Sequence, residues 1–254
     1  MVSWEKIIAE AELLKKDNPT LKKFIENQIT QHITFNECIA GIVLSKLSKD
    51  KEVMPLLKED VLNVLDNLEL ISKIKLDLSF IFKSDPACNS HLSALLFYKG
   101  FHALCFYRIG NFFWKENKNF LGLFFQSKAS ELFGIDIHPA AEIEPGVLID
   151  HGTGVVIGET AIIGQNVSIF QGVTLGGKGH EIGKRHPTVH EGATIYASST
   201  VLGNIVIGKN SIVAAGSLVL KDVAEGETVA GIPARKVRNL NHHTQDWDPG
   251  KAGL

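Results

Sequence analysis

The sequence predicts an α+β protein in which an N-terminal all-α domain precedes a parallel β-helix of hexapeptide repeats. Two changes along the chain predict this fold class. Apolar residues recur at helical spacing from residue 3 to about residue 133, and aliphatic residues then recur every six positions. Most of the 23 glycines also lie from Gly134 onward, where the period changes. We expect a helical domain over residues 1–134, a β-helix over 135–240 and a flexible tail over 241–254.

Length, charge and composition restrict the class of protein. The 254 residues are 44% hydrophobic, which suits one or two globular domains. A net charge of −2 gives no bulk attraction to nucleic acid or an anionic membrane. No apolar run reaches the ~18 residues of a membrane span, and the N-terminus lacks a signal-peptide pattern. The three cysteines have no metal-type spacing. We therefore expect a cytoplasmic protein with no bound metal and no nucleic-acid or membrane partner.

The helical half consists of apolar stripes separated by helix-breaking signals. Asn18-Pro19-Thr20 separates the first two stripes, and a long apolar run extends from Leu57 to Phe82. Ser84-Asp85-Pro86 predicts the start of another helix, with Asp85 as its N-cap and Pro86 in its first turn. The apolar content exceeds what one small bundle needs. Part of this surface is therefore expected to contact another subunit.

A period of six residues fits neither an α-helix nor a flat sheet. It fits a triangular coil whose sides are short strands and whose corners are turns, with three hexads to each coil. The aliphatic residue of each hexad points into the prism, and a small or β-branched residue four positions later occupies the crowded corner. The aliphatic positions fall into three registers: Ile137, Ile143 and Ile149; Ile157, Ile163, Ile169 and Leu175; Val189, Ile195, Val201, Ile207, Val213 and Val219.

The six-residue period is broken twice, and both breaks carry polar and ionisable side chains. Eight positions separate Ile149 from Ile157, around Asp150-His151-Gly152. Fourteen positions separate Leu175 from Val189, around Arg185-His186-Pro187. A solenoid accommodates an insertion by extruding it from a corner, and loops on a rigid scaffold often carry reactive groups. The two breaks therefore predict a functional site. The alternative for each histidine taken singly is a solvated loop residue.

Several motifs resemble those of serine O-acetyltransferases in the hexapeptide-repeat acetyltransferase family. In the second half they are residues 136–141, 150–154, 158–161, 171–177, 185–187 and 231–235, and in the helical half residues 85–87, 101–104 and 107–110. The resemblance covers roughly residues 80 to 240. It implies a left-handed β-helix. It also implies transfer of acetyl from acetyl-CoA to the hydroxyl of L-serine, which gives O-acetyl-L-serine for cysteine biosynthesis.

The same resemblance implies catalytic and substrate-binding roles. His151 is expected to be the general base, Asp136 its orienting partner, and His186 a contact to the substrate or the developing oxyanion. A histidine of near-neutral pKa can accept the proton of a serine hydroxyl as it attacks a thioester. The zwitterionic substrate needs contacts of both signs, and the implied ones are Asp85 and Asp150 for its ammonium and Arg185 for its carboxylate. Structural alternatives remain: a helix cap for Asp85, a turn cap for Asp136 and a solvated charge for Arg185.

CoA is expected to lie along the outside of the coils. The resemblance implies contacts at Gly177, Ala197, Ala215, Lys221 and Arg235, where small residues admit the pantetheine arm and cations suit the phosphates. The alternative for the small residues is packing at coil corners. A metal cofactor is not expected.

Assembly and partners are also implied by the resemblance. It implies a homotrimer or a dimer of trimers, with active sites between neighbours, and L-cysteine as an inhibitor at the serine site. Relatives bind O-acetylserine sulfhydrylase through a C-terminal isoleucine, and this chain ends in Leu254. The aliphatic end with its carboxylate is retained, which makes the sulfhydrylase a possible partner.

Three other functions are compatible with parts of this pattern. A hexapeptide acyltransferase acting on a sugar or another hydroxyl acceptor is disfavoured by the helical domain and the Asp150-His151 pair. A β-helix zinc hydratase would use His180, His186 and His190, whose spacing does not favour a shared metal. A non-enzymatic scaffold that only binds the sulfhydrylase is disfavoured because the expected base and its partner carboxylate are both present.

Overall fold

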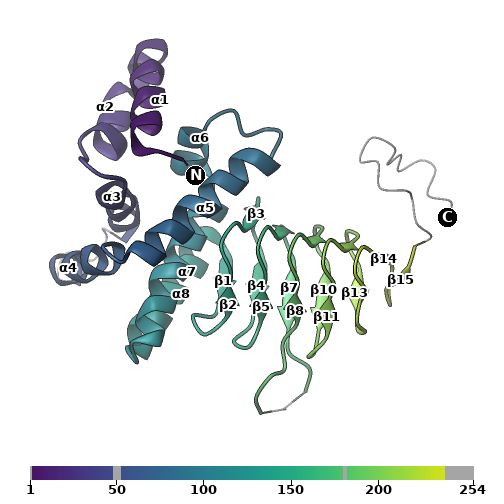
Figure 1. Cartoon of the computed structure of the whole chain (residues 1–254). Helices are drawn as coiled ribbons and strands as arrows, with labels where there is room; N and C mark the ends of the chain where they lie inside the picture. The colour runs from purple at the N-terminus through teal and green to yellow at the C-terminus, as the bar shows by residue number, and fades with distance from the viewer. Residues whose placement is uncertain (1, 48–52, 180–181, 238–254) are drawn as a thin grey trace.

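The computed structural model describes residues 2–47, 53–179 and 182–237, and it places a helical half against one end of a three-sided parallel β-helix (Figure 1). The helices are α1 (Trp4–Asp17), η1 (Pro19–Leu21), α2 (Lys22–Ile25), η2 (Glu26–Thr30), α3 (Phe35–Leu47), α4 (Val53–Leu65), α5 (Leu68–Ser84), α6 (His91–Phe97), α7 (Lys99–Lys115) and α8 (Asn119–Phe133). None of the helices in the described ranges is long and apolar enough to cross a lipid bilayer.

The strands form three sheets, which are the three sides of the prism. Sheet A contains β1 (Ile135–Ile137), β4 (Val155–Ile157), β7 (Thr174–Gly176), β10 (Thr200–Leu202) and β13 (Leu218–Val219). Sheet B contains β2 (Glu142–Ile143), β5 (Ile162–Ile163), β8 (Thr188–Val189) and β11 (Val206–Ile207). Sheet C contains β3 (Leu148–Asp150), β6 (Ser168–Phe170), β9 (Thr194–Ile195), β12 (Ile212–Val213), β14 (Thr228–Ala230) and β15 (Arg235–Lys236).

The register of these strands confirms the six-residue period. The predicted aliphatic residues lie opposite one another in successive coils, as Ile137 does with Ile157 and Ile157 with Leu175. The same holds on sheets B and C, for example for Ile163 with Val189. These side chains are buried and fill the prism as a continuous apolar column. The predicted fold class is therefore confirmed.

Both insertions leave the prism at corners, and the corners differ. The turn 150–154 joins β3 to β4 and so lies between sheets C and A, at what we call the CA corner. The loop 177–187, of which 177–179 and 182–187 are described, joins β7 to β8 at the AB corner. Figure 1 shows the loop below sheet A and the end of β3 above it. Sheet A therefore separates the two insertions within one chain.

The prediction that Asp85 starts a helix is wrong. Asp85 directly follows α5, and its Oδ1 accepts a hydrogen bond of 2.8 Å from the N–H of Ala87. The side chain thus closes a local turn, and the N-cap of α6 is Ser90, which accepts from the N–H of Ser93 at 3.0 Å. An aspartate before proline favours both arrangements, because each uses the carboxylate as an acceptor for a backbone N–H two or three residues later.

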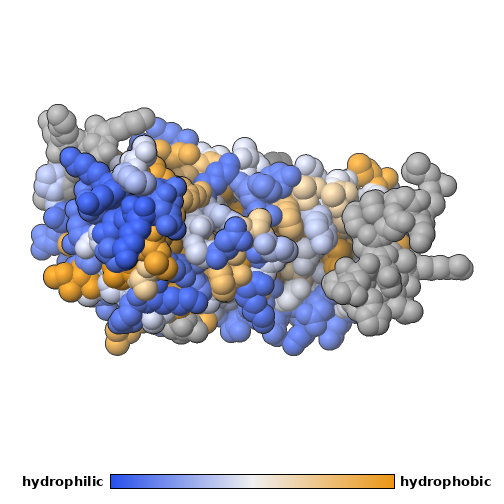
Figure 2. All heavy atoms as spheres, turned by 90° about the horizontal axis from the view of Figure 1, so that it is seen from above, coloured by the Kyte–Doolittle hydropathy of each residue, from blue (hydrophilic) through white to orange (hydrophobic). Residues whose placement is uncertain are grey.

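The apolar surface of the helical half is not fully covered in a single chain. Figure 2 shows hydrophobic atoms exposed at the helical end of the molecule among hydrophilic ones. Among the side chains of this half that the structure describes, the most exposed large apolar ones are those of Phe120, Ile33, Leu68, Leu13 and Phe97. The long predicted apolar run is also divided into α4 and α5, because Asn67 caps α5 by accepting from the N–H of Leu70 at 3.0 Å.

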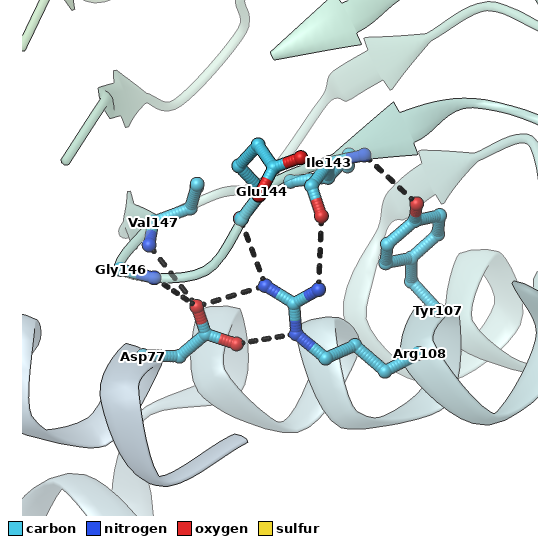
Figure 3. Close-up of polar contacts among 7 residues, drawn as sticks. All are labelled: Asp77, Tyr107, Arg108, Ile143, Glu144, Gly146 and Val147. Atoms are coloured by element: carbon cyan, nitrogen blue, oxygen red, sulfur yellow. Dashed lines mark hydrogen bonds and ion pairs between the residues drawn. The ribbon is translucent and has the colours of Figure 1, made fainter. Parts of the chain in front are cut away.

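A buried ion pair joins the helical half to the first coil (Figure 3). Arg108 on α7 donates to Asp77 on α5 through Nε at 2.6 Å and Nη2 at 2.9 Å, and both side chains are almost fully buried. Their remaining hydrogen-bonding groups reach the first coil. Arg108 donates to the carbonyls of Ile143 and Glu144, and Asp77 accepts from the N–H groups of Gly146 and Val147. The first coil has no preceding coil to bond, so this pair supplies the missing partners.

Candidate active site

The predicted base lies on a tight turn at the CA corner. His151 adopts a φ of 55°, in the left-handed region that few residues other than glycine occupy. The N–H of Gly152 donates to the carbonyl of Asp150 at 2.5 Å, and the N–H of Thr153 donates to that of His151 at 3.0 Å. The imidazole is 74% exposed, and its Nε2 lies 3.9 Å from Asp150 Oδ1. The turn therefore holds a histidine and a carboxylate side by side, open to an incoming substrate.

The corner between α6 and α7 packs directly on this turn. Gly100 lies so close to β3 that a Cβ at this position would be 1.9 Å from the carbonyl oxygen of Ile149. The Lys99 ammonium hydrogen-bonds to the hydroxyl of Thr153. Tyr98, at the same helix corner, donates a hydrogen bond from its hydroxyl to Asp85 Oδ2 at 2.8 Å. The structure thus places Asp85, Asp150 and His151 on one side of the chain, and we call these three residues the CA half-site.

Arg185 and His186 end the long loop at the AB corner, and Thr160 holds them there. The Thr160 hydroxyl accepts from the backbone N–H groups of Arg185 at 3.0 Å and His186 at 3.1 Å. The His186 ring lies over Gly158, where a Cβ would come within 2.0 Å of Nε2. Only glycine admits the ring at this distance. We call Arg185 and His186 the AB half-site.

The hydrogen bonds of His186 determine which nitrogen carries its proton. Nδ1 accepts from the N–H of Thr160 at 3.2 Å and lies 2.9 Å from its hydroxyl, whose lone pairs already accept from two N–H groups. The hydroxyl therefore donates to Nδ1, and the proton of the neutral ring lies on Nε2. Burial, followed by the cations Arg185 and Lys184, lowers the pKa of His186. At neutral pH this residue is thus a neutral Nε2–H donor.

Arg185 is oriented by a carboxylate of the preceding coil. Its Nη2 lies 2.5 Å from Glu159 Oε2, and this hydrogen bond lowers the pKa of Glu159. Both side chains are partly exposed. His138 lies near the same charges, and burial lowers its pKa. The AB half-site therefore presents one fixed cation and one neutral donor.

Asp136, the expected partner of His151, has another contact in a single chain. It lies on β1, and its Oδ1 accepts from the side-chain N–H of Gln126 on α8 at 2.7 Å. No hydrogen bond or ion pair joins it to His151 among the contacts of the described residues.

The five residues expected to contact CoA divide between the same two corners. Ala197 and Ala215 lie on the CA corner, in a column that rises from the His151 turn. In it the N–H of Gly172 bonds the carbonyl of Thr153, and the N–H of Gly216 bonds the carbonyl of Ala197, both at 2.8 Å. Arg235 follows a turn that hydrogen-bonds to the start of β13, above this column. Gly177 and Lys221 lie on the AB corner. All except Ala197 are exposed.

One chain does not bring the two half-sites together, because sheet A lies between their corners. Sequence reasoning also missed two residues that hold them. Thr160 lies within a motif that the resemblance includes, but its hexad position predicts only a corner. Tyr98 reads as part of a helix until α6 and α7 are seen to break there. Neither carried a separate signal.

The described residues contain no group of three or more His, Cys, Asp or Glu side chains that could hold a metal ion. Of the histidines considered for zinc, His180 lies outside the described residues. His186 uses Nδ1 to bind Thr160, and His190 is exposed on another corner, between sheets B and C.

A parallel β-helix of hexapeptide repeats with a histidine extruded at a corner is the architecture of hexapeptide acyltransferases. Residues 186–221 match the family model for bacterial transferase hexapeptide repeats, and residues 3–105 match the model for the serine acetyltransferase N-terminal region. Solved serine acetyltransferases resemble most of the chain. A complex with cysteine has 40% identity and a TM-score of 0.88, covering 92% of this chain and 98% of that one. The chain belongs to the serine acetyltransferase family.

Two further structures agree with this likeness. A serine acetyltransferase in complex with CoA has 39% identity and a TM-score of 0.87, covering 92% of this chain and 98% of that one. The Neisseria gonorrhoeae serine acetyltransferase in complex with serine has 38% identity and a TM-score of 0.88, with 93% and 97% covered. The serine acetyltransferase of Buchnera aphidicola from Acyrthosiphon pisum is 40% identical over 144 residues, 55% of this chain and 52% of that protein. The chain thus spans about half the length of the curated relatives it matches.

Proposed function

We propose that this chain transfers acetyl from acetyl-CoA to the hydroxyl of L-serine and releases O-acetyl-L-serine and CoA. The observation that carries the proposal is the His151 turn, an exposed imidazole beside a carboxylate on the scaffold of this family. Relatives in complex with serine and with CoA support the two substrates. They favour this reaction over acetylation of a sugar.

The proposed reaction is a direct transfer. The His151 imidazole accepts the proton of the serine hydroxyl as its oxygen attacks the thioester carbon. The tetrahedral intermediate carries an oxyanion, to which the Nε2–H of His186 can donate. Collapse breaks the C–S bond, and the imidazolium returns its proton to the CoA thiolate. Asp136 is proposed to orient His151 through Oδ2, because the bond from Gln126 is made to Oδ1.

Serine recognition follows from the charges of the two half-sites. Asp85 and Asp150 are the proposed partners of the ammonium, and Arg185 that of the carboxylate. Arg185 is already held at 2.5 Å by Glu159, so the guanidinium is oriented before serine binds. A substrate that lacks one of the two charges would lose all the proposed contacts to that charge.

The half-sites lie at corners at the two opposite ends of the sheet A strands. We therefore propose a homotrimer in which sheet A faces the three-fold axis. The CA half-site of one protomer then meets the AB half-site of its neighbour. Outward-facing apolar side chains on and beside sheet A support this, since Val156 is 39% and Leu220 is 42% exposed. The proposed CoA groove runs in the same cleft, with contacts at Gly177, Ala197, Ala215, Lys221 and Arg235. The exposed apolar residues of the helical half support a dimer of trimers.

The remaining parts of the proposal concern regulation, location and organisation. L-cysteine is proposed to inhibit at the serine site, as a relative in complex with cysteine suggests. A cytoplasmic location fits three free, buried cysteines. Residues 1–134 would assemble the oligomer and complete the serine site, and residues 135–240 would carry catalysis. The tail, residues 241–254 with Leu254, through which the sulfhydrylase is a possible partner, lies outside the described residues.

The test is release of CoA from acetyl-CoA and L-serine by wild type and the His151→Ala variant. Loss of a general base is expected to lower kcat by about 10²–10⁴-fold while the trimer stays intact by light scattering. His190→Ala is the matched control, since this exposed histidine belongs to neither half-site, and it should retain wild-type turnover. Wild-type turnover in His151→Ala would exclude His151 as the base. Acetylation of sugars but not of serine by the wild type would overturn the proposed function.

A further inference from the structure

Asp85 is held at both of its oxygens. Oδ1 accepts from the N–H of Ala87 at 2.8 Å, and Oδ2 accepts from the Tyr98 hydroxyl at 2.8 Å. A carboxylate has about two acceptor sites on each oxygen. Each oxygen of Asp85 therefore keeps one lone pair for another donor, while the plane of the carboxylate is fixed.

The backbone of Tyr98 is itself fixed against the catalytic turn. Its N–H donates to the carbonyl of Ala94 at 3.2 Å, and its carbonyl accepts from His102 at 3.1 Å, so it ends α6 and begins α7. The next two residues contact the turn: Lys99 binds Thr153, and Gly100 lies against Ile149. The Tyr98 hydroxyl thus transmits the position of the His151 turn to a carboxylate on a separate segment.

The hydroxyl remains a donor throughout the neutral range. Burial, followed by the hydrogen bond to Asp85, raises the pKa of the Tyr98 phenol. A donor to an ionised carboxylate makes a stronger hydrogen bond than one between neutral groups. Asp85 lies in a loop, residues 85–90, between α5 and α6. Without Tyr98 its carboxylate would keep a single fixed oxygen.

We infer that Tyr98 is a positioning residue that orients the Asp85 carboxylate toward Asp150, so that the pair binds the ammonium group of the acceptor amino acid. This inference rests on the proposed function and adds a residue to it. Tyr98 touches neither the reacting hydroxyl nor the thioester in this arrangement. Its loss should therefore weaken acceptor binding far more than it slows the chemical step.

The test is the Tyr98→Phe variant of the full-length chain, which removes only the hydroxyl. The KM for serine is expected to rise about tenfold, while kcat falls less than about threefold and the KM for acetyl-CoA stays unchanged. Serine affinity is also measured by calorimetry. In an Asp85→Asn background, Tyr98→Phe should have no further effect on serine affinity, because both changes remove the same oriented carboxylate.

The matched control is Tyr107→Phe, which removes a buried hydroxyl that donates to the carbonyl of Ala141 at 2.6 Å, away from both half-sites. It should lower the melting temperature and leave the KM for serine unchanged. An unchanged KM for serine in an active Tyr98→Phe enzyme would overturn the positioning role and leave the proposed function standing. An equal rise in both variants, or additive effects with Asp85→Asn, would also overturn it. A wild-type chain unable to acetylate serine would instead refute the proposed function.

Discussion

The side chain of Thr160 holds both residues of the AB half-site in place. One hydroxyl accepts from two consecutive backbone N–H groups and donates to the His186 ring. Three features of the site depend on it: the path of the loop end, the tautomer of His186 and the direction in which Nε2–H points. The carbonyl of Thr160 also accepts from the Lys184 ammonium at 2.6 Å. A single side chain thus fixes a segment whose own residues form no regular structure.

Thr160→Val keeps the shape of this side chain and removes its hydroxyl. The kcat/KM for serine is expected to fall about tenfold, because Arg185 and His186 lose their shared acceptor and the ring loses the donor that fixes its tautomer. Steady-state kinetics measure the effect. Thr153→Val is not a suitable comparison, since Thr153 binds Lys99. Thr194→Val, on β9 of sheet C, changes a similar side chain on another face of the prism and should keep wild-type kinetics. Wild-type kinetics in Thr160→Val would show that the loop is held by other contacts.

At the scale of elements, the β-helix could be predicted from the sequence and the helical half only in outline. Ile137, Ile157 and Leu175 reveal the coil, because inward-facing side chains must recur with the period of the prism. The breaks in α4–α5 and α6–α7 were not predicted, since apolar periodicity continues through Asn67 and Tyr98. The packing of the helical half on the first coil could not be predicted either.

The ion pair that joins the helical half to the first coil leaves no local pattern in the sequence. Asp77 resembles an ordinary polar residue on a helix surface, and its partner Arg108 lies 31 positions away. Nothing in local spacing links them. Within the site, the residue types at the two breaks were predictable, because extruded loops interrupt a regular period. Their distribution over two corners was not, since it depends on which side of the prism each insertion follows.

The packing of α6 against α7 predicts how stability depends on pH. His102 is buried, its Nε2–H donates to the carbonyl of Leu95 at 2.8 Å, and burial, with Lys46 nearby, lowers its pKa to about 4. An unfolded histidine has a pKa of about 6.5. The unfolded state therefore binds more protons between these values, and stability, complete above pH 6.5, falls as the pH drops toward 4, by at most about 1.4 kcal/mol per pH unit from this group.

Urea unfolding at pH values from 4 to 8 measures this dependence, and His102→Gln is the comparison, because it keeps a donor near Leu95 but does not titrate. Burial also lowers the pKa of His138 and His186, so the His102→Gln variant should still show part of the pH dependence of the wild type. The difference between the two slopes isolates His102. Identical slopes would mean that folding does not lower the pKa of His102.

At the scale of the whole molecule, the proposed trimer would make activity depend on neighbouring chains. Each chain has a CA half-site at the corner where the sheet A strands begin and an AB half-site at the corner where they end. In a ring of three, every chain would complete two sites, one with each neighbour. A defect in one half-site should then be complemented by a chain with a defect in the other.

Co-refolding His151→Ala with Arg185→Ala chains tests this arrangement. Random mixing gives about three quarters mixed trimers, each with one site whose two halves are intact, so about one quarter of wild-type activity should return. Each variant refolded alone should stay inactive, and mixing without unfolding should restore nothing. A mixture as inactive as its components would place both half-sites of each active site within one chain.

The ends of the β-helix bear on how copies of this chain can associate. At the first coil, free backbone groups are occupied by Asp77 and Arg108, and at the far end β15 runs antiparallel to β14 on sheet C. A bare terminal rung would act as a template on which further copies could polymerise end to end into fibres. Here one end is plugged by helices, and the other offers a strand of reversed direction. Neither end therefore presents a regular parallel rung to a second copy, which disfavours growth along the axis and is compatible with the sideways association of the proposed trimer.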